Sequence, residues 1–321
     1  MDVRNIYAMY EPDLSQVEEI LRESVQSRNP LLTEAAVQLL EAGGKRIRPL
    51  FALIGSRFGT AQSDLIYVLA SALELVHMAT LVHDDVIDDA PTRRGKPTIR
   101  AWMGNHPAMY TGDFLFARAI DLLSHIDDPA IHSEMSMAMV RMCEGEIEQI
   151  RDFYDLNQPL RNYLRRVERK TALLISVSCS LGAKVAGSPE STVKTLRQFG
   201  YYTGMAFQIT DDILDYVGDE KTVGKPVGGD LRQGNLSLPA LYAAASSPHA
   251  QALRQLIHEG MDRDAVEQAI LLVRDSDALT FAKDIAERYM LKAMQALSRL
   301  EPSPVRDNLA GVAEFVNNRK F

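Results

Sequence analysis

Cysteine is nearly absent from this chain of 321 residues, which contains only Cys143 and Cys179. Their spacing fits neither a disulfide framework nor a metal-binding cluster. We therefore interpret both as small buried apolar residues of a protein that resides in the reducing cytoplasm. This usage excludes a small secreted domain stabilised by disulfides.

Long apolar runs and an excess of positive charge are missing as well. No uninterrupted stretch of about 18 apolar residues occurs, so we expect no membrane span. The first residues, MDVR, lack the basic and then apolar pattern of a signal peptide, so we expect no leader. The net charge is −8 and the isoelectric point lies near 5.5, which argues against general binding of nucleic acids.

The alternation of a β-strand is absent too, and proline is missing from long stretches such as residues 50–90 and 190–225. Apolar residues recur there with a helical period, for example Leu65, Leu69 and Val76. Because proline is barred from helix interiors, these stretches predict long helices. We expect an all-α fold in a single domain over residues 1–321. Helices are expected over residues 13–28, 30–42, 45–59, 63–88, 129–153, 159–186 and 189–216, with another opening at Gly112 and a mobile loop over residues 218–234.

Two acidic motifs of the form Asp-Asp-x-x-Asp interrupt apolar helical segments. The first consists of Asp84, Asp85 and Asp88, and the second of Asp211, Asp212 and Asp215. Residues four apart share a helix face, so Asp84 and Asp88 point the same way, as do Asp211 and Asp215. One such motif alone is common on a solvated helix end. Both copies follow apolar residues, however, and buried carboxylates need a partner or a metal ion.

Two such pairs on facing helices predict a shared metal site. Gathered carboxylates repel one another unless cations bind between them. Mg²⁺ prefers oxygen ligands and usually keeps coordination positions for substrate phosphates. We therefore expect several Mg²⁺ ions at this site, with Mn²⁺ as an alternative, and a phosphorylated substrate.

Basic residues occur where an anionic substrate needs them. Lys45, Arg46 and Arg48 lie at a predicted helix start, where backbone N–H groups favour anions. Arg93 and Arg94 follow the first acidic motif closely enough to reach the same site, and guanidinium groups suit bidentate binding of phosphate. Taken alone, each group is more often a solvated cap or loop, and it is their combination with the acidic motifs that favours binding.

Polar residues on apolar helices add to this set. His77 lies two turns before the first motif on the same face, although a lone histidine in such a place is more often a core residue. Lys170 and Thr171 interrupt an apolar run, where a lysine more often extends to solvent. Gln208 lies on the carboxylate face of the second motif. Lys225 belongs to the glycine-rich loop, where simple solvation is the alternative.

Small residues precede the first acidic motif. Ala79 and Thr80 lie about one helical turn before Asp84, where an aromatic side chain would close an apolar tunnel. An apolar tunnel beneath a diphosphate-binding mouth implies a prenyl chain, and the small residues favour a long product. Met135 and Met139 are candidates for the tunnel floor.

The motifs resemble, in order and over nearly the whole chain, those of the trans-polyprenyl diphosphate synthases. The matching segments are GGKRIRP at 43–49, His77, DDVID at 84–88, RRG at 93–95, Lys170-Thr171, Phe207-Gln208, DDILD at 211–215 and GKPVGGD at 224–230. Asn235 departs from the pattern, since many relatives carry lysine there. The segments CEGEIEQ (143–149) and YLRRVERKTALLISVSC (163–179) resemble the catalytic large subunit (component II) of bacterial two-component heptaprenyl diphosphate synthases.

This resemblance implies an isoprenoid synthase-like bundle of long antiparallel helices around a central cavity. It implies Mg²⁺ on Asp84, Asp88 and Asp211, with Asp85, Asp212 and Asp215 completing or supporting the metal shell. The residues implied for isopentenyl diphosphate are Lys45, Arg48, His77 and Arg94, and those for the allylic diphosphate are Arg93, Lys170, Thr171, Gln208 and Lys225. The implied partner is a small non-catalytic subunit (component I) or a second copy of the chain.

The expected reaction is head-to-tail condensation of isopentenyl diphosphate with an allylic diphosphate. The expected product is all-trans heptaprenyl diphosphate for the side chain of menaquinone, with the hexaprenyl and octaprenyl products as alternatives. A terpene cyclase shares the fold, but it usually carries a different second motif and lacks the isopentenyl site. A non-catalytic regulatory subunit typically lacks one or both acidic motifs, and both are complete here.

Overall fold

The structure is a computed structural model that describes residues 3–61, 64–217 and 227–317. Its residues divide into two units. The first unit comprises Met1–Met135, Val177–Arg197 and Leu300–Val312, and the second comprises Ser136–Ser176, Gln198–Arg299 and Ala313–Phe321. The relative position of the two units is not determined, and the organisation of the chain as a single domain stays a prediction.

Helices make up nearly all of the regular structure, which confirms the predicted all-α class. The long helices are α1 (Val3–Ser24), α4 (Leu65–Ile87), α6 (Asn105–Leu123), α7 (Pro129–Arg151), α10 (Glu190–Val217) and α16 (Ala278–Leu297). The shorter helices are α2 (Pro30–Glu41), α3 (Ile47–Ser56), α5 (Ile99–Met103), α8 (Leu160–Val167), α9 (Leu173–Val185), α12 (Gly229–Arg232), α13 (Leu238–Ser246), α14 (Ala250–Leu256), α15 (Arg263–Arg274) and α17 (Pro304–Asn317). A π-helical turn, η1 (Glu168–Ala172), connects α8 to α9.

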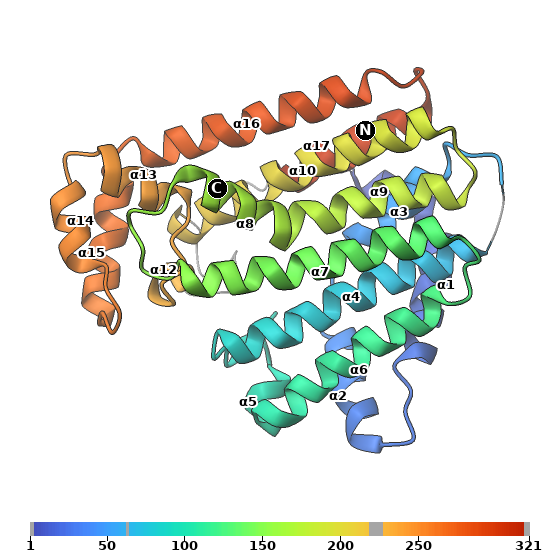
Figure 1. The fold of residues 1–321 in the computed structure, drawn as a ribbon, viewed down its shortest axis with the longest axis horizontal. Helices are drawn as coiled ribbons and strands as arrows, with labels where there is room; N and C mark the ends of the chain where they lie inside the picture. Colours follow the sequence, from blue (N-terminus) through green and yellow to red (C-terminus); the bar gives the residue numbers. More distant parts are fainter. Residues whose placement is uncertain (1–2, 62–63, 218–226, 318–321) are drawn as a thin grey trace. The chain divides into compact units, whose positions relative to one another are not determined.

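Helix α4 is the central element of the first unit, where it packs against α1, α3 and α6 (Figure 1). Most of its apolar residues are buried, and Glu74 and Asp85 are buried among them. Within the described residues, α4 alone is long and apolar enough to cross a membrane by length and composition. Because 67% of its apolar window is buried inside the protein, it has the character of a core helix.

The close contact between α4 and α6 depends on Gly112. A Cβ atom at this position would lie 2.2 Å from Nε2 of His83 on α4, so no larger residue fits without movement of the ring. The same ring nitrogen lies 3.2 Å from the Met109 carbonyl oxygen. The expectation that a helix opens at Gly112 is therefore wrong, because this glycine provides space in the middle of α6 and not a helix start.

The second unit has a core of its own beneath α8 and α10. Tyr163 and Val167 of α8 pack in one buried cluster with Met205, Ile209 and Ile213 of α10. Residues of α12 to α16 complete this cluster, and α13 packs against α14, α15 and α16. The part of α10 that carries the second acidic motif therefore packs into an apolar cluster.

Several boundaries differ from the predicted ones. Helix α1 begins ten residues earlier than residue 13 and contains Pro12. A proline inside a helix costs about 3 kcal/mol. Burial of Ile6, Tyr10 and Val17, each worth roughly 1.5–3 kcal/mol, outweighs that cost.

The remaining differences concern the loops. The basic loop after the first acidic motif forms a small antiparallel hairpin of β1 (Thr92–Arg93) and β2 (Lys96–Pro97), in which Arg93 is paired with Lys96. The predicted helix over residues 159–186 is interrupted by the π-helical turn η1. The predicted loop over residues 218–234 contains the short helix α12, while residues 218–226 lie outside the described residues.

Candidate active site

The first acidic motif occupies the C-terminal end of α4. Asp84 and Asp85 lie in the last turn, and the backbone N–H of Asp88 at the C-cap donates to the Asp84 carbonyl oxygen at 2.8 Å. Asp84 and Asp88 therefore lie on successive turns of one face. Carboxylates at this end add to the partial negative charge of the helix dipole, so the site favours a bound cation.

Asp85 pairs with an arginine of the β-hairpin. Its carboxylate is buried and accepts a hydrogen bond on Oδ1 from Nε of Arg93 at 2.8 Å, and Nη2 of the same guanidinium lies 2.7 Å from that oxygen. This ion pair connects the β-hairpin to the end of α4. Asp85 thus positions Arg93, whereas Asp84 and Asp88 remain the candidates for direct metal binding in this unit.

A group of arginines lies beside this motif in the first unit. A Cβ atom on Gly44 would lie 2.9 Å from Nη1 of Arg94 and 3.1 Å from Nη1 of Arg46, so the absence of a side chain at Gly44 lets both guanidinium groups approach the loop. The Nε atom of Arg48 is buried and has no hydrogen-bond partner among the described residues. Burial lowers the pKa of Arg48 to about 10, although the negative charge of Glu74 opposes this effect.

His77 lies among these arginines on α4. Burial holds its pKa well below its usual value, and the charges of Arg48, Arg94 and Arg93 add to the effect. The imidazole is therefore neutral near pH 7, so it can donate one hydrogen bond and accept another. The structure thus brings together three of the predicted isopentenyl diphosphate residues, Arg48, His77 and Arg94.

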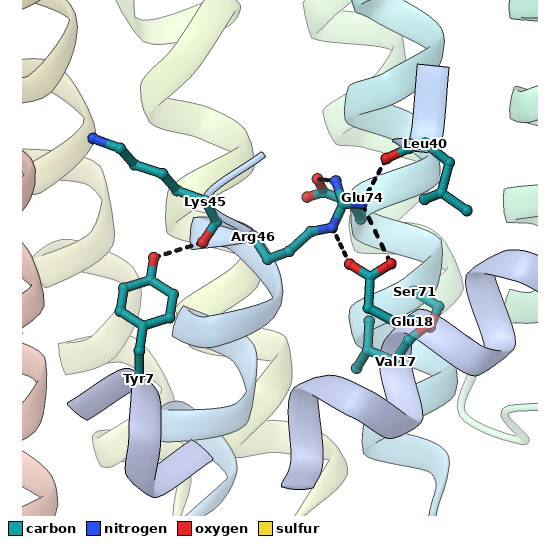
Figure 2. Close-up of polar contacts among 8 residues, drawn as sticks. All are labelled: Tyr7, Val17, Glu18, Leu40, Lys45, Arg46, Ser71 and Glu74. Carbon is teal, nitrogen blue, oxygen red and sulfur yellow. Dashed lines mark hydrogen bonds and ion pairs between the residues drawn. The ribbon is translucent and has the colours of Figure 1, made fainter. Parts of the chain in front are cut away.

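Lys45, the fourth residue of that set, faces another direction. Its carbonyl oxygen accepts a hydrogen bond from the Tyr7 hydroxyl at 2.5 Å. Figure 2 shows the Lys45 side chain extending away from Arg46, on the opposite side of the loop. The two neighbouring cations of the motif therefore have different surroundings, with Arg46 directed towards the helices and Lys45 exposed.

The predicted chain-length residues lie one turn before the first motif. Ala79 is fully buried, and Thr80 is partly buried with its hydroxyl donating to the His77 carbonyl oxygen at 2.7 Å. Ala79 therefore has no room for a larger side chain unless an adjoining space exists. Met135 is buried and Met139 is partly buried, and they belong to different units.

The second acidic motif is embedded in a hydrogen-bond network of the second unit. Asp212 is buried, and its carboxylate accepts hydrogen bonds from the Tyr163 hydroxyl at 2.6 Å and from Nε2 of Gln208 at 2.8 Å. Burial and the nearby charge of Asp230 raise the pKa of Asp212 to about 7, while the two donors act in the opposite direction. Asp212 thus anchors the motif, and Asp211 is exposed.

The π-helical turn η1 presents Lys170 and Thr171 to this network. The Thr171 hydroxyl donates to Oε1 of Gln208 at 2.5 Å, which orients the amide towards Asp212. Nζ of Lys170 lies 3.5 Å from Oε1 of Gln149 and 3.7 Å from Oε2 of Glu146, both on α7. π-helical turns occur frequently at functional sites. This one contains Lys170 and Thr171 and contacts Gln208 through the Thr171 hydroxyl.

Asp215 stabilises the start of the short helix α12. Its carboxylate accepts hydrogen bonds from the backbone N–H of Gly229 at 3.2 Å and of Asp230 at 3.3 Å. The last residue of the motif is therefore linked to the segment that follows the undescribed part of the chain. Lys225, predicted to hold the allylic diphosphate, lies outside the described residues.

The two acidic motifs belong to different units, so their predicted approach stays a prediction. Within the described ranges, no group of three or more His, Cys, Asp and Glu side chains is arranged to hold a metal ion. The carboxylate oxygens of Asp84, Asp88 and Asp211 nevertheless have the chemistry that Mg²⁺ prefers, and all three are at least partly exposed. The carboxylate oxygens of each motif, taken by itself, fit a divalent cation.

Sequence reasoning missed several residues of these networks. Glu74 and Tyr163 received no role, although a buried acid three residues before His77 is a signal that a cation must lie nearby. Arg46 was noted at the helix start but not assigned. Asp230 ends one of the matched motifs, and its charge near Asp212 becomes evident only in the fold.

Comparison with known proteins gives these networks a family context. The profile of the Polyprenyl synthetase family matches residues 29–273, which is most of the chain. The chain belongs to the polyprenyl synthetase family. This synthetase is 46% identical to heptaprenyl diphosphate synthase component 2 of Bacillus subtilis (strain 168) over 321 residues, covering 100% of this chain and 92% of the relative. It is 47% identical to the protein of the same name from Geobacillus stearothermophilus, with both chains fully covered.

Solved structures resemble the polyprenyl synthetase over its full length as well. The crystal structure of heptaprenyl diphosphate synthase from Staphylococcus aureus matches with a TM-score of 0.92 at 38% identity, covering 99% of both chains. That of a polyprenyl synthase from Caulobacter crescentus CB15, complexed with calcium and isoprenyl diphosphate, matches with a TM-score of 0.94 at 33% identity, covering 99% of this chain and 98% of that one. The family predicted from the motifs is thereby confirmed.

Proposed function

We propose that the chain is the catalytic subunit of a heptaprenyl diphosphate synthase. It condenses isopentenyl diphosphate head-to-tail onto an allylic diphosphate and repeats the step until the product is an all-trans chain of seven isoprene units. The observation that carries this proposal is the group of Arg48, Arg94 and neutral His77, in which Arg94 interacts with the charge of Asp85 in the first acidic motif. Such a site suits two diphosphates. The arginine and histidine side chains bind one directly, and a metal ion on the carboxylates binds the other.

The proposed cofactor is Mg²⁺, held by Asp84, Asp88 and Asp211, with Mn²⁺ as a substitute. When bound, the metal withdraws charge from the diphosphate leaving group of the allylic substrate. Support comes from the carboxylate donors and from the relative of Caulobacter crescentus, whose structure contains calcium and isoprenyl diphosphate. Asp85, Asp212 and Asp215 would support this shell through Arg93, Tyr163 and the start of α12.

The side chains of the two units divide the work of binding. In our proposal Lys45, Arg48, His77 and Arg94 hold the diphosphate of isopentenyl diphosphate. The proposed allylic diphosphate residues are Arg93, Lys170, Thr171, Gln208 and Lys225. Fixed donors around both diphosphates align the reacting carbons and stabilise negative charge on the leaving group.

The bond changes of one cycle follow from these roles. The bond between C1 of the allylic substrate and its diphosphate oxygen breaks, and the double bond of isopentenyl diphosphate attacks C1. A proton then leaves the new chain, and the released diphosphate accepts it. The longer allylic product moves with its tail past Ala79 and Thr80, whose size we propose permits a long chain.

We further propose a cytoplasmic enzyme that acts with a small non-catalytic subunit, or else as a homodimer. The relatives from Bacillus subtilis and Geobacillus stearothermophilus are named component 2, which supports a second component for this chain. A seven-unit product would supply the side chain of menaquinone. Hexaprenyl and octaprenyl products are the alternatives within the same chemistry.

A product assay tests this proposal. The purified chain is incubated with Mg²⁺, farnesyl diphosphate and labelled isopentenyl diphosphate, alone and with the small subunit from the same cell. We expect a seven-unit product in the presence of the small subunit. Asp84→Ala should reduce turnover by about 10²-fold or more while the helical content is retained. A folded Asp84→Ala protein that keeps most of its activity with saturating Mg²⁺ would refute the metal assignment.

A further inference from the structure

Arg46 is bound by three elements of the first unit at once (Figure 2). Its guanidinium forms an ion pair through Nε with Glu18 of α1, and its Nη1 lies 3.1 Å from Oε1 of Glu74 on α4. Its Nη2 also donates to the carbonyl oxygen of Leu40 on α2 at 3.2 Å. One side chain therefore connects α1, α2 and α4.

This network is largely removed from solvent. The side chain of Arg46 is 10% exposed, that of Glu74 is 4% exposed and that of Glu18 is 33% exposed. Surface ion pairs contribute little because water and salt screen them, whereas removal of one partner from a buried pair leaves an unpaired charge. The network is therefore a fixed part of the fold.

The backbone at Arg46 is unusual as well. Arg46 is the N-cap of α3 and has φ 46° and ψ 40°, in the left-handed region that residues other than glycine rarely adopt. Such a conformation persists only where the surroundings determine it. Here the ion pairs fix the side chain of Arg46, and the Tyr7 hydroxyl fixes the preceding carbonyl oxygen of Lys45.

The left-handed residue determines where its neighbours point. Lys45, on one side, extends away from Arg46 (Figure 2), and Arg48, on the other, lies in the first turn of α3 near Glu74 and Arg94. Both neighbours are isopentenyl diphosphate residues in the proposed function. Arg46 itself is occupied by Glu18, Glu74 and Leu40, so it is not arranged as a ligand.

We propose that Arg46, held by Glu18 and Glu74, is a positioning residue that sets the directions of Lys45 and Arg48 for binding isopentenyl diphosphate. The proposal rests on the proposed function and deepens it. It assigns a purpose to a buried acid, Glu74, that has no role in the proposed binding of substrate or metal. It also explains why the loop contains two adjacent cations that face opposite ways.

Steady-state kinetics of the active enzyme, with its small subunit where activity requires it, test the proposal. Arg46→Gln removes the ion pairs, and we expect the KM for isopentenyl diphosphate to rise about ten-fold or more, since small misplacements of binding groups are costly. The KM for the allylic diphosphate should change less than about two-fold and kcat less than about three-fold, because Lys170, Thr171 and Gln208 lie in the second unit and Arg93 is held by Asp85. Arg22→Gln, at an exposed pair 3.9 Å from Glu41 on the same unit, is the matched control and should leave both constants unchanged.

Arg46→Lys separates position from charge. A lysine keeps the charge but cannot bridge acceptors on three helices, so the KM for isopentenyl diphosphate should stay raised by about five-fold or more. A normal KM in this variant would mean that only the charge matters and would overturn the proposal. A lowered melting temperature with both KM values unchanged would mean a purely structural role and would overturn it as well.

The failure of the proposed function is distinguishable from the failure of this inference. If the wild-type enzyme transfers no prenyl group, the proposed function is wrong. Binding of inorganic pyrophosphate, measured by calorimetry on the folded chain, then decides the inference. We expect the dissociation constant to rise about ten-fold in Arg46→Gln, as for the substrate. Equal affinities in wild type and variant would refute the positioning role.

Discussion

Tyr163→Phe tests the network that supports the second acidic motif. The substitution removes one oxygen atom, whose O–H donates to the buried Asp212 carboxylate at 2.6 Å. Tyr163 is 1% exposed, so water cannot easily replace the lost donor. The phenyl ring keeps its place in the apolar cluster of the second unit, which limits the change to one hydrogen bond.

The size of the effect depends on the charge of Asp212. A hydrogen bond to a charged group contributes about 1.5–3 kcal/mol, and one between neutral groups about 0.5–1.5 kcal/mol. Because the pKa of Asp212 is raised to about 7, its carboxyl group is ionised at pH 8 and protonated at pH 5 in the folded, metal-free protein. We therefore expect the variant to lose about 1.5–3 kcal/mol of unfolding free energy at pH 8 and about half of that at pH 5.

Equilibrium urea unfolding of wild type and variant in metal-free buffer measures both values. The raised pKa also predicts that the contribution of Asp212 to stability is greatest below its unfolded pKa, near 4, and is lost as the pH rises through about 7. Loss of the Tyr163 donor raises the pKa of Asp212 further. In the variant, the pH at which the contribution of Asp212 to the unfolding free energy is lost should therefore be higher. An equal loss at pH 5 and pH 8, or a loss under about 0.5 kcal/mol at pH 8, would refute the reasoning.

Two further predictions concern the first unit. The pKa of His77 is lowered, so on acidification the unfolded chain takes up a proton that the folded chain excludes. Below about pH 6.5 the unfolding free energy of wild type should therefore fall, relative to that of His77→Gln, by up to about 1.4 kcal/mol per pH unit. Urea unfolding at pH 7.5 and 5.5 checks this. A difference in unfolding free energy between wild type and His77→Gln that does not change with pH would contradict it. Ala79→Tyr places an aromatic ring at a fully buried position before the acidic motif, so the product should shorten to about three or four isoprene units by chromatography of the labelled products. Unchanged product length in a folded variant would remove Ala79 as a determinant.

The helices were predictable from the sequence where proline and glycine mark their ends. Pro30 begins α2 as expected, and Pro129 begins α7. The start of α1 was missed because the predicted helix begins at residue 13, after Pro12, whereas burial of the apolar residues around Pro12 favours a continuous helix. Sequence alone shows where a proline lies but not how much apolar surface the fold buries around it.

The chemistry of the site was predictable in type but not in geometry. Regular spacing placed Asp84 and Asp88 on one helix face. The same spacing could not tell that Asp85 turns to Arg93, or that Asp212 turns to Tyr163, because those partners come from a hairpin and from another helix. The role of Glu74 likewise depends on Arg46, which reaches it from a loop far away in the sequence.

The π-helical turn Glu168–Ala172 changes the direction in which the residues after it point around the helix axis. In an unbroken α-helix, residues eight positions apart differ by about 80° around the axis. The wider π turn absorbs much of that difference, so Tyr163 before it and Thr171 after it both reach α10, at Asp212 and Gln208. In geometry the turn is equivalent to one extra residue inserted into an α-helix. Deletion of a single residue would restore a regular helix, yet it would turn Thr171 away from Gln208 and separate the helix from the second acidic motif.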